Sequence, residues 1–505
     1  MDRTAPRPAS RARRTFFIAL ASVALSGCVS MQGLQPQATP ADPSHLQIRN
    51  SLAGVALTPA AWPRADWWKA LGDHQLDALI DEALAGNPSI AAVDARVRVA
   101  LAQAGAQDAK RKPMVGGKAA YNGIEVPSTL APPPFGGHYL AANIWTVGGS
   151  YSPDLWGGHR AAWEAAVDGV HAAQVDARAA RLSLAAGIVQ TYAELAHAQA
   201  LAAIAQREID RAAGIRSLTV QRVKAGLDGE FQLRQADVAV AAAQRMLDAA
   251  RAQQAQVRVQ LAALAGQGPD RGLQLTAPAS FPAMALALPS DLPSDLLARR
   301  PDVVAARWRV EAAARGIAAM KAQFYPSINL GLTAGLASAH LGTLFEAPSH
   351  YAQIGPSLSL PIFDGGRLRA GLAGRDAAFD AAVAQYDQTL VDAVHEVAEQ
   401  VIARRAIDAQ IASQQQALAA ATAAYALADS RWRGGLASRL DVYAVEQGVL
   451  RAEQQLADLH AQRDVLAVQL VRALGGGFMA DGALLPPTAA PDTRLPRTPS
   501  PGARR

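Results

Sequence analysis

Residues 300–338 read RPDVVAARWRVEAAARGIAAMKAQFYPSINLGLTAGLAS, and the hydrophobic period changes within this stretch. Pro301 fits the first position of a helix, because the N–H that proline lacks has no partner there. The helix predicted from Pro301 runs to Tyr325, and Pro326 ends it. Beyond Pro326 apolar residues alternate with polar or small ones, as in a strand with one apolar face: Ile328, Leu330, Leu332, Ala334 and Leu336. The stretch therefore predicts a helix that runs directly into a strand.

The same order of prolines and glycine motifs occurs earlier in the chain. Asn87-Pro88 and Pro113 precede Arg300-Pro301 and Pro326 by 213 residues, and the glycine motifs further on recur after 208 or 209. Each copy is too long to be one unit of a solenoid. We therefore predict two similar halves around a pseudo-symmetry axis. They cover residues 61–266 and 300–478, and an inter-repeat linker covers 267–299.

Each copy contains one predicted β-hairpin, at about residues 115–155 and 327–363. Strands of about ten residues are long enough to cross a bilayer when tilted. Four strands cannot close a barrel alone, because single-chain barrels have about eight or more and open edges leave backbone groups unpaired in lipid. The chain must therefore oligomerise, and three copies would give a 12-stranded trimeric β-barrel that encloses a pore.

Long helices follow the hairpins, because residues 158–226 and 366–434 contain no proline. Each would reach roughly 100 Å at 1.5 Å per residue. The second has a near-heptad apolar seam, typical of helices that pack side by side: Phe379, Val383, Tyr386, Leu390, Val394, Val397 and Val401. A glycine turn and a shorter return helix come next in each copy, and the return helix stacked end to end on the helix from Pro88 or Pro301 would match the long one. The fold class predicted is mainly α with a membrane β part, in which duplicated coiled-coil hairpins form a trimeric α-barrel.

The first 27 residues have the features of a secretory signal peptide, with five arginines before an apolar run at 16–25. Leu25-Ser26-Gly27-Cys28 resembles a bacterial lipobox, which implies cleavage before Cys28 and lipidation of this cysteine, the only one in the chain. The alternative is an ordinary signal peptide with a chance cysteine. If Cys28 is lipidated, residues 28–60 form a lipidated tether. The Pro-, Thr- and Arg-rich residues 479–505 are predicted to form a disordered tail.

Composition and motifs exclude several classes of function. Removing residues 1–27 takes five Arg and one Asp from 48 basic and 43 acidic residues, leaving 43 and 42, so the basic pI does not indicate nucleic acid. His395-Glu396 begins a metalloprotease-like string, but Glu399 stands where the second histidine ligand would be. The Trp67-Trp68 pair is interpreted as packing rather than a ligand box. We therefore expect no enzymatic activity, no cofactor and no metal site.

The motifs together resemble the TolC-like outer-membrane efflux factors, and within them the lipoprotein branch (NodT/OprM type), over about residues 28–478. The resemblance rests on the duplication, the lipobox and the ordered motifs Trp67-Trp68, Asn87-Pro88, Asp154-Leu155-Trp156-Gly157-Gly158 and Pro361-Ile362-Phe363-Asp364-Gly365-Gly366. The first copy lacks the Pro-Ile-Phe triplet of the second. The resemblance implies a homotrimer in outer-membrane lipid, joined to a periplasmic adaptor (membrane fusion) protein and an inner-membrane pump, with an RND or MFS pump favoured over an ABC type.

The function that this resemblance implies is a passive exit duct for drugs or toxic small molecules across the periplasm and outer membrane. A duct for type I protein secretion is an alternative within the same class. A periplasmic structural spacer lipoprotein is an alternative from another class, although a spacer would not need matched alternating hairpins in both halves.

The resemblance also assigns residues to the periplasmic tips. The turns Gly226-Leu227 and Gly435-Leu436 match positions where family members meet the adaptor. Leu440 and Asp441 match positions that form constricting apolar and acidic rings, and Ala444 replaces a second acidic position. Ser438 and Asp441 also have the spacing of a capping box that opens the return helix, and both roles can hold.

Three arginines flank the second tip, Arg431, Arg433 and Arg439. They could latch a closed gate through ion pairs, or they could be solvated charges at helix ends. Both interpretations remain open at the level of sequence.

Overall fold

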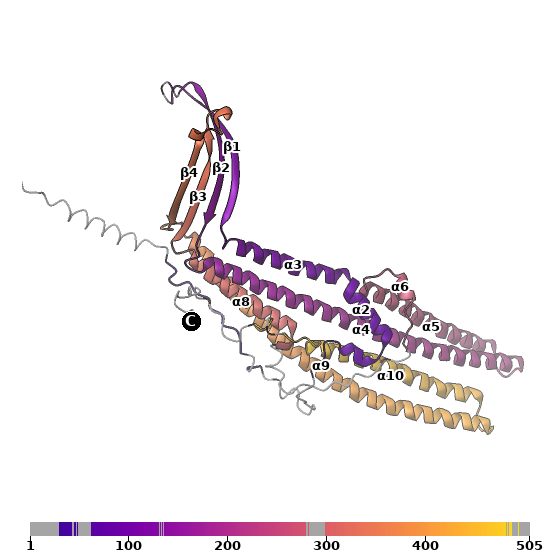
Figure 1. Ribbon diagram of the computed structural model, residues 1–505. Coiled ribbons are helices and arrows are strands. Elements are labelled where there is room, and N and C mark those ends of the chain that lie inside the picture. The colour runs from indigo at the N-terminus through magenta and orange to yellow at the C-terminus, as the bar shows by residue number, and fades with distance from the viewer. Residues whose placement is uncertain are drawn as a thin grey trace, which may run out of the picture.

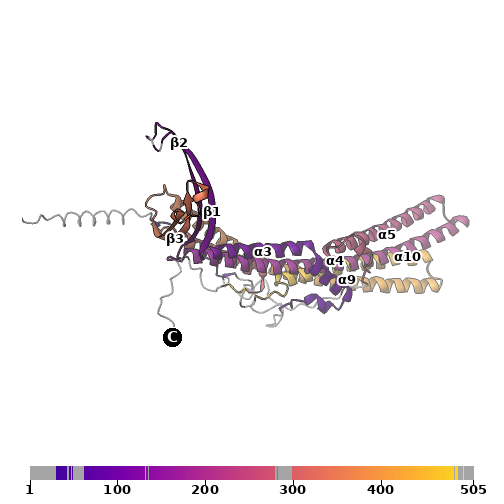
Figure 2. The same ribbon diagram turned by 45° about the horizontal axis from the view of Figure 1, so that its top comes forward.

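The computed structural model describes residues 30–42, 62–130, 136–278 and 298–480, together with a few single positions between and beyond these ranges. The predicted signal peptide, Cys28, residues 49–61 and most of the predicted linker lie outside the described residues. The described chain has a narrow sheet at one end, and a bundle of long helices extends away from it (Figure 1). A turned view separates the two helical hairpins at the far end (Figure 2).

Both copies share one order of main elements: a short helix, two strands, a long helix and a return helix. The first contains η2 (Trp67–Leu71), α2 (His74–Gly86), α3 (Pro88–Ala109), β1 (Met114–Val126), β2 (His138–Tyr151), α4 (Gly158–Lys224), α5 (Glu230–Leu264) and the short α6 (Asp270–Leu273). The second contains α8 (Pro301–Ala322), β3 (Ser327–Ser338), β4 (His350–Ser359), α9 (Arg367–Arg433) and α10 (Arg439–Ala473), with η3 (Leu341–Thr343) and η4 (Ala347–Ser349) between its strands. The predicted fold class is confirmed, and the helix that starts at Pro301 does run into a strand.

Small and branched apolar residues hold the helical bundle together. The seven seam residues of α9 are all buried. Helix α4 lies against α3, α5, α8 and α10, and most of the residues that it buries are small or branched, with alanine the commonest. Such small side chains let the backbones of several helices approach closely. None of the helices in the part of the chain that the structure describes is long and apolar enough to span a membrane.

In each copy the return helix and the shorter helix stack end to end. Asn87 Nδ2 donates to the carbonyl of Leu264 at the end of α5 (2.7 Å), while its Oδ1 accepts from Ser89 N at the start of α3 (2.8 Å). Arg300 Nη1 likewise donates to the carbonyl of Ala473 at the end of α10 (3.0 Å). The positive end of one helix dipole therefore meets the negative end of the next.

Glycine is required where the stacked helices meet. Gly475 has φ +90, and a Cβ added there would lie 1.9 Å from the carbonyl oxygen of Arg299. Gly266 has φ +75, and its Cβ would lie 2.9 Å from Asn87 Cα. Either change would push the two helices of the stack apart. The stacked pairs therefore run beside the 67-residue helices α4 and α9, as predicted.

The predicted tether packs against the protein over residues 30–42. Asp380 Oδ1 accepts from the backbone N–H groups of Gln37 and Ala38, both at 2.9 Å, and Asp387 Oδ1 accepts from that of Ala41 at 2.8 Å. Arg369 donates to the carbonyl of Ser30 at 2.5 Å. We call residues 30–42 the strap. It follows α9 from the end of that helix that adjoins the sheet.

The packed part of the chain also continues past residue 478. Trp308 Nε1 donates to the carbonyl of Leu484 (2.9 Å), and Ala480 and Leu484 are buried against the same tryptophan. Apolar contact with α8 therefore orders the start of the segment that composition alone had placed in a tail.

Candidate functional site

The four strands form one antiparallel sheet in the order β1-β2-β3-β4, and its register separates two faces. Partners in the ladder share a face, so the alternation of one strand extends across all four. One face is mainly apolar, with Glu125, Asn143, Ser338 and His350 toward its far end as the exceptions. Most of its larger apolar side chains are exposed in the single chain: Val115, Ala119, Tyr121, Trp145, Val147, Ile328, Leu330, Leu332, Ala334, Leu336, Ile354 and Leu358. An exposed surface of this composition fits contact with lipid. We call it the apolar face.

Aromatic residues lie at both ends of the apolar face. At the far end the rings of Trp145 and Phe345 meet edge to face at 5.5 Å. At the end next to the helices Trp156 stacks on Tyr325 at 4.8 Å, and its Nε1 donates to the carbonyl of Pro326 (2.7 Å). The aliphatic band between them, measured from Ile328 to Leu336, covers roughly 26 Å along the strand. Aromatic girdles around a band about 25 Å tall are typical of outer-membrane strands.

The opposite face of the sheet, which we call the polar face, carries mostly small and polar residues, with Met114, Ile124, Ile144 and Tyr351 among its larger apolar and aromatic members. Its members include Asn122, Thr146, Gly148, Ser150, Asn329, Thr333, Gly335, Gln353 and Ser357. Lys118 is the one lysine or arginine on the four strands, and it lies on this face opposite Thr146. A membrane sheet with one lipid-facing and one polar surface is the wall of a water-filled pore.

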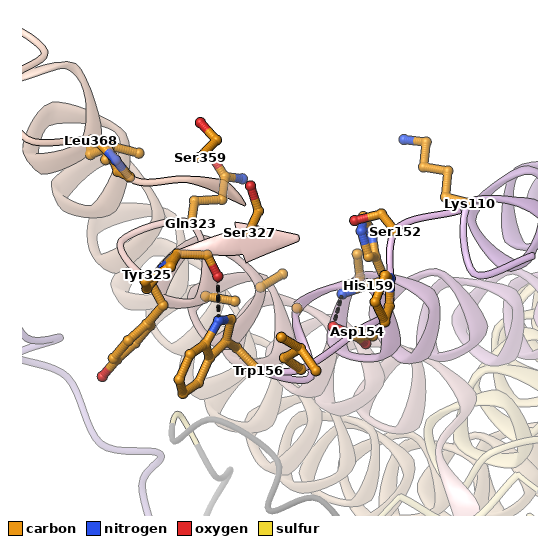
Figure 3. Close-up of a pocket in the computed structure, with 18 of the residues that line it drawn as sticks. Lys110, Ser152, Asp154, Trp156, His159, Gln323, Tyr325, Ser327, Ser359 and Leu368 are labelled. Carbon is orange, nitrogen blue, oxygen red and sulfur yellow. Dashed lines mark hydrogen bonds between the residues drawn. The ribbon is translucent and has the colours of Figure 1, made fainter. Parts of the chain in front are cut away.

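A cavity of about 530 Å³ lies where the strands meet the helices. Asp154 caps α4 there, because its carboxylate accepts from the backbone N–H groups of His159 (3.2 Å) and Arg160 (2.7 Å). Figure 3 shows Lys110, Ser327 and Ser359 on one side of the connecting segments and the rings of Trp156 and Tyr325 on the other. Ser327 and Ser359, which are partners on the polar face, line this cavity together with Trp156 and Tyr325.

The two tips have the same backbone geometry. Leu227 N donates to Arg222 O and Leu436 N to Arg431 O, both at 2.8 Å, and each bond closes a helix end around a glycine. Gly226 and Gly435 have φ +72 and +73, which only glycine adopts readily. Leu227 and Leu436 follow and are exposed. Each of the two predicted adaptor turns therefore presents one exposed leucine side chain beyond the end of the long helix.

At the second tip Asp441 caps the return helix. Its carboxylate accepts from Ser438 N and Ser438 Oγ, both at 2.8 Å, and Ser438 Oγ accepts from Asp441 N at 3.2 Å. These bonds, that of the Ser438 hydroxyl first, hold the pKa of Asp441 below its ordinary value. The side chain is exposed, and the neighbouring Leu440 is half-buried. The capping alternative is thus present in the single chain.

Two of the three arginines considered for a latch converge on one aspartate that the sequence alone did not single out. Asp429 lies 2.8 Å from Arg433 and 3.2 Å from Arg439. Arg439 also lies over the rings of Trp432 and Tyr443, at 4.3 and 4.9 Å. The spacing of four residues between Asp429 and Arg433 is the sequence signal for such a pair.

Tyr443 also connects the two tips, a contact that no sequence motif indicated. Its carbonyl accepts from Arg211 of α4 (3.2 Å), and its hydroxyl lies where a Cβ at Gly214 would come within 2.3 Å. Gly214 is therefore the position that lets α10 approach α4 near the tips.

A buried charged cluster joins α4 to α8 in the half of the bundle nearer the sheet. Arg315 contacts Asp168 and Glu164, both at 2.5 Å. Asp168 is almost fully buried, and this burial raises its pKa to about 6 despite the attraction of Arg315. Glu311 lies nearby, pairs with Arg307 at 3.1 Å, and has its pKa raised by burial as well.

The raised pKa of Asp168 predicts a loss of stability with rising pH. The folded protein binds this proton more tightly than the unfolded chain, so the stabilisation is complete below about pH 4 and is lost as the pH passes 6. Asp168→Asn should remove this slope, which is on the order of 1–3 kcal/mol per chain. Thermal unfolding of both proteins between pH 4 and 7 measures it. Parallel curves for the two proteins would contradict the prediction.

Comparisons with known proteins agree with this geometry. The family model described as outer membrane efflux protein matches twice, at residues 79–267 and 292–476. The fusaric acid resistance protein FusA of Burkholderia cepacia is 37% identical over 381 residues, which are 73% of this chain and 70% of that protein. The multidrug resistance outer membrane protein MdtP of Escherichia coli K12 is 30% identical over 466 residues, 90% of this chain and 94% of that one.

Among solved structures, the outer membrane protein VceC of Vibrio cholerae superposes with a TM-score of 0.74 at 34% identity, covering 83% of this chain and 100% of that chain. The outer-membrane channel OprN gives 0.75 at 27% identity, with 88% and 98% covered. The resemblance noted in the sequence is confirmed. The chain belongs to the outer membrane efflux protein family.

Proposed function

We propose that the chain is the exit duct of a tripartite efflux system and works as a homotrimer. The observation that carries this proposal is the four-stranded sheet with one apolar and one polar face. The outer edges of β1 and β4 pair with no strand among the described residues, and unpaired edges are costly in lipid. Three sheets joined edge to edge give twelve strands and close the ring. The helices then continue the pore away from the membrane.

Size and conductance of the purified protein test this proposal together. In detergent, light scattering should give the mass of three chains, and the same sample should form ion-conducting channels in planar bilayers. A folded monomer, or a trimer without conductance, would refute the duct.

We infer small organic molecules as the cargo. The names of the relatives support this: fusaric acid resistance, multidrug resistance and, for OpmQ of Pseudomonas putida at 30% identity, pyoverdine export. The duct has no energy source of its own, so an inner-membrane pump, RND or MFS rather than ABC, must supply it through a periplasmic adaptor. The exposed Leu227 and Leu436 are the proposed adaptor contacts. A protein-secretion duct has no such support, and a spacer leaves the apolar face unexplained.

We also propose lipidation at Cys28, and the strap supports it. Ser30 is held at the start of α9, beside the base of the strands, by Arg369. A lipid on Cys28, two residues before Ser30, would be expected to reach the inner leaflet, because two residues of chain span at most about 7 Å. Intact-mass analysis of the mature protein should show an acylated N-terminal Cys28, and a start at another residue would exclude the lipobox.

At the far end we propose that Leu440 and Asp441 of three chains meet on the axis and close the resting duct. Helices that converge at the Gly435 turn would bring these side chains together. Pairs of the kind made by Asp429 with Arg433 and Arg439 would stiffen each tip, and Arg431 would add positive charge beside the ring. Capping and gating then share one carboxylate.

A further inference from the structure

We propose that Lys118 of three chains forms a basic ring within the membrane part of the pore, and that this ring selects organic anions as cargo. The inference rests on the trimeric duct proposed above. Its basis is the sheet register, which places Lys118 in the row Lys118, Thr146, Gly335, Tyr351 on the polar face.

The depth of Lys118 follows from its neighbours on the other face. Ala119 pairs with Trp145, which pairs with Leu336, and Gly117 pairs with Val147. These residues lie at the far end of the apolar band, where Trp145 stands, so Lys118 lies near the outer boundary of the hydrocarbon. The register places its side chain on the polar face, so the ammonium points into the pore.

The surroundings of Lys118 leave its charge without compensation. The strands contain one carboxylate, Glu125, which lies an odd number of residues away and so on the opposite face. Lys118 is in no ion pair among the residues that the structure describes. Its neighbours on the polar face are small, with Gly116 and Ala120 along the strand and Thr146 opposite it on β2, beyond which lies Gly335. Small side chains at these positions leave the pore wide and keep the ammonium in water.

A second basic level lies just below the strands. Lys110, at the end of α3, lines the 530 Å³ cavity on the side of Ser327 and Ser359. The carboxylate in that cavity, Asp154, is occupied by the two N–H groups of α4. Arg367 lines the same cavity and is 3.9 Å from Asp364. Cargo leaving the helical part would therefore meet positive charge at the junction and again at Lys118.

Two levels of cation in series attract anions and hinder cations. The chemical class that fits is an organic anion with an apolar body, such as a carboxylate or sulfonate. Its charge would be drawn toward the ring while its body crossed a pore lined mainly by small and polar side chains.

Block of single channels by a polyvalent anion tests the ring. Pyrenetetrasulfonate added on the strand side in 0.1 M KCl should block the wild type. Three neutralised charges weaken this attraction, so Lys118→Gln should raise the half-blocking concentration at least about tenfold. In 1 M KCl the Debye length falls to about 3 Å and the difference should vanish. Lys69→Gln, far from the sheet, is the control and should block as the wild type does. Equal block of wild type and Lys118→Gln would overturn the proposal.

Cysteine labelling tests the direction of the side chain by itself. A membrane-impermeant thiol reagent should modify Lys118→Cys and leave Ala119→Cys, the adjacent residue on the apolar face, unmodified. The wild type, whose single cysteine is Cys28, is the background. The reverse pattern would place Lys118 in lipid and exclude the ring. Trimer mass and conductance are measured on the same samples, so loss of the duct itself is distinguished from loss of selectivity.

Discussion

Arginine in place of Leu332 is expected to prevent stable insertion of the trimer. Leu332 lies in the middle of the apolar face, in a row with Gly149 and Ile354, and is half exposed in the single chain. A charge at this depth costs about 2–4 kcal/mol, and three chains carry three such charges. Heat-modifiable trimer on gels and the yield of protein in outer-membrane fractions measure the effect.

The adjacent residue is the matched control for this substitution. Thr333 belongs to the polar face, opposite Gly148 and Gln353. Thr333→Arg should therefore insert and assemble nearly as well as the wild type, although it adds the same side chain one position further along the strand. If both variants assembled equally, or if Thr333→Arg were the worse of the two, our choice of lipid face would be wrong.

Removal of the apolar side chain at the second tip should open the resting duct. We expect Leu440→Ala to admit vancomycin to intact cells and to raise resting conductance in planar bilayers. The physical reason is that three leucines converging on an axis exclude water, and three alanines leave a wetted gap. Sensitivity to vancomycin, compared at equal expression, is the measurement. Unchanged sensitivity and conductance together would remove Leu440 from the gate.

Asp441 needs a variant that separates its two roles. Three carboxylates on an axis would bind cations and raise one another's pKa, whereas the bonds from Ser438 lower the pKa of Asp441 in each chain. Asp441→Asn should therefore weaken block by divalent cations. Ser438→Ala removes the hydroxyl partner of the same cap, keeps the charge and costs about 1 kcal/mol of helix stability. If the two variants changed cation block equally, capping would be the sole role.

Much of this architecture could be predicted from the positions of the prolines and from the spacing of apolar residues. The prolines at 88, 113, 301 and 326 set the short helices, and the absence of proline set the two 67-residue helices. The second hairpin was clear because Leu330 and Leu332 alternate with small residues. The first was weaker because Gly116, Gly117, Gly148 and Gly149 interrupt its apolar alternation.

Other features depended on pairing across the chain. The sequence shows an apolar face on β3, but extending that face across all four strands required the register. In the sequence Arg300 is only the residue that precedes Pro301. Its contact with the carbonyl of Ala473 joins residues 173 apart and exists only in the folded chain. Asp429 does not stand out in the sequence, because an acidic residue on a solvated helix is common. Packing of Leu484 on Trp308 follows from shape, which composition does not encode.

The strap has a consequence for how its own sequence can vary. Asp380 and Asp387 bind backbone N–H groups, so they recognise a path of the chain and not particular side chains. Pro36 and Pro40 stand next to the donors, at positions where no N–H is used. The sequence of the strap should therefore vary freely among related proteins, as long as the residues that donate these N–H groups are not proline. The two carboxylates of α9 that bind the strap should tolerate little change. Sequence conservation should therefore be found on the helix rather than on the strap.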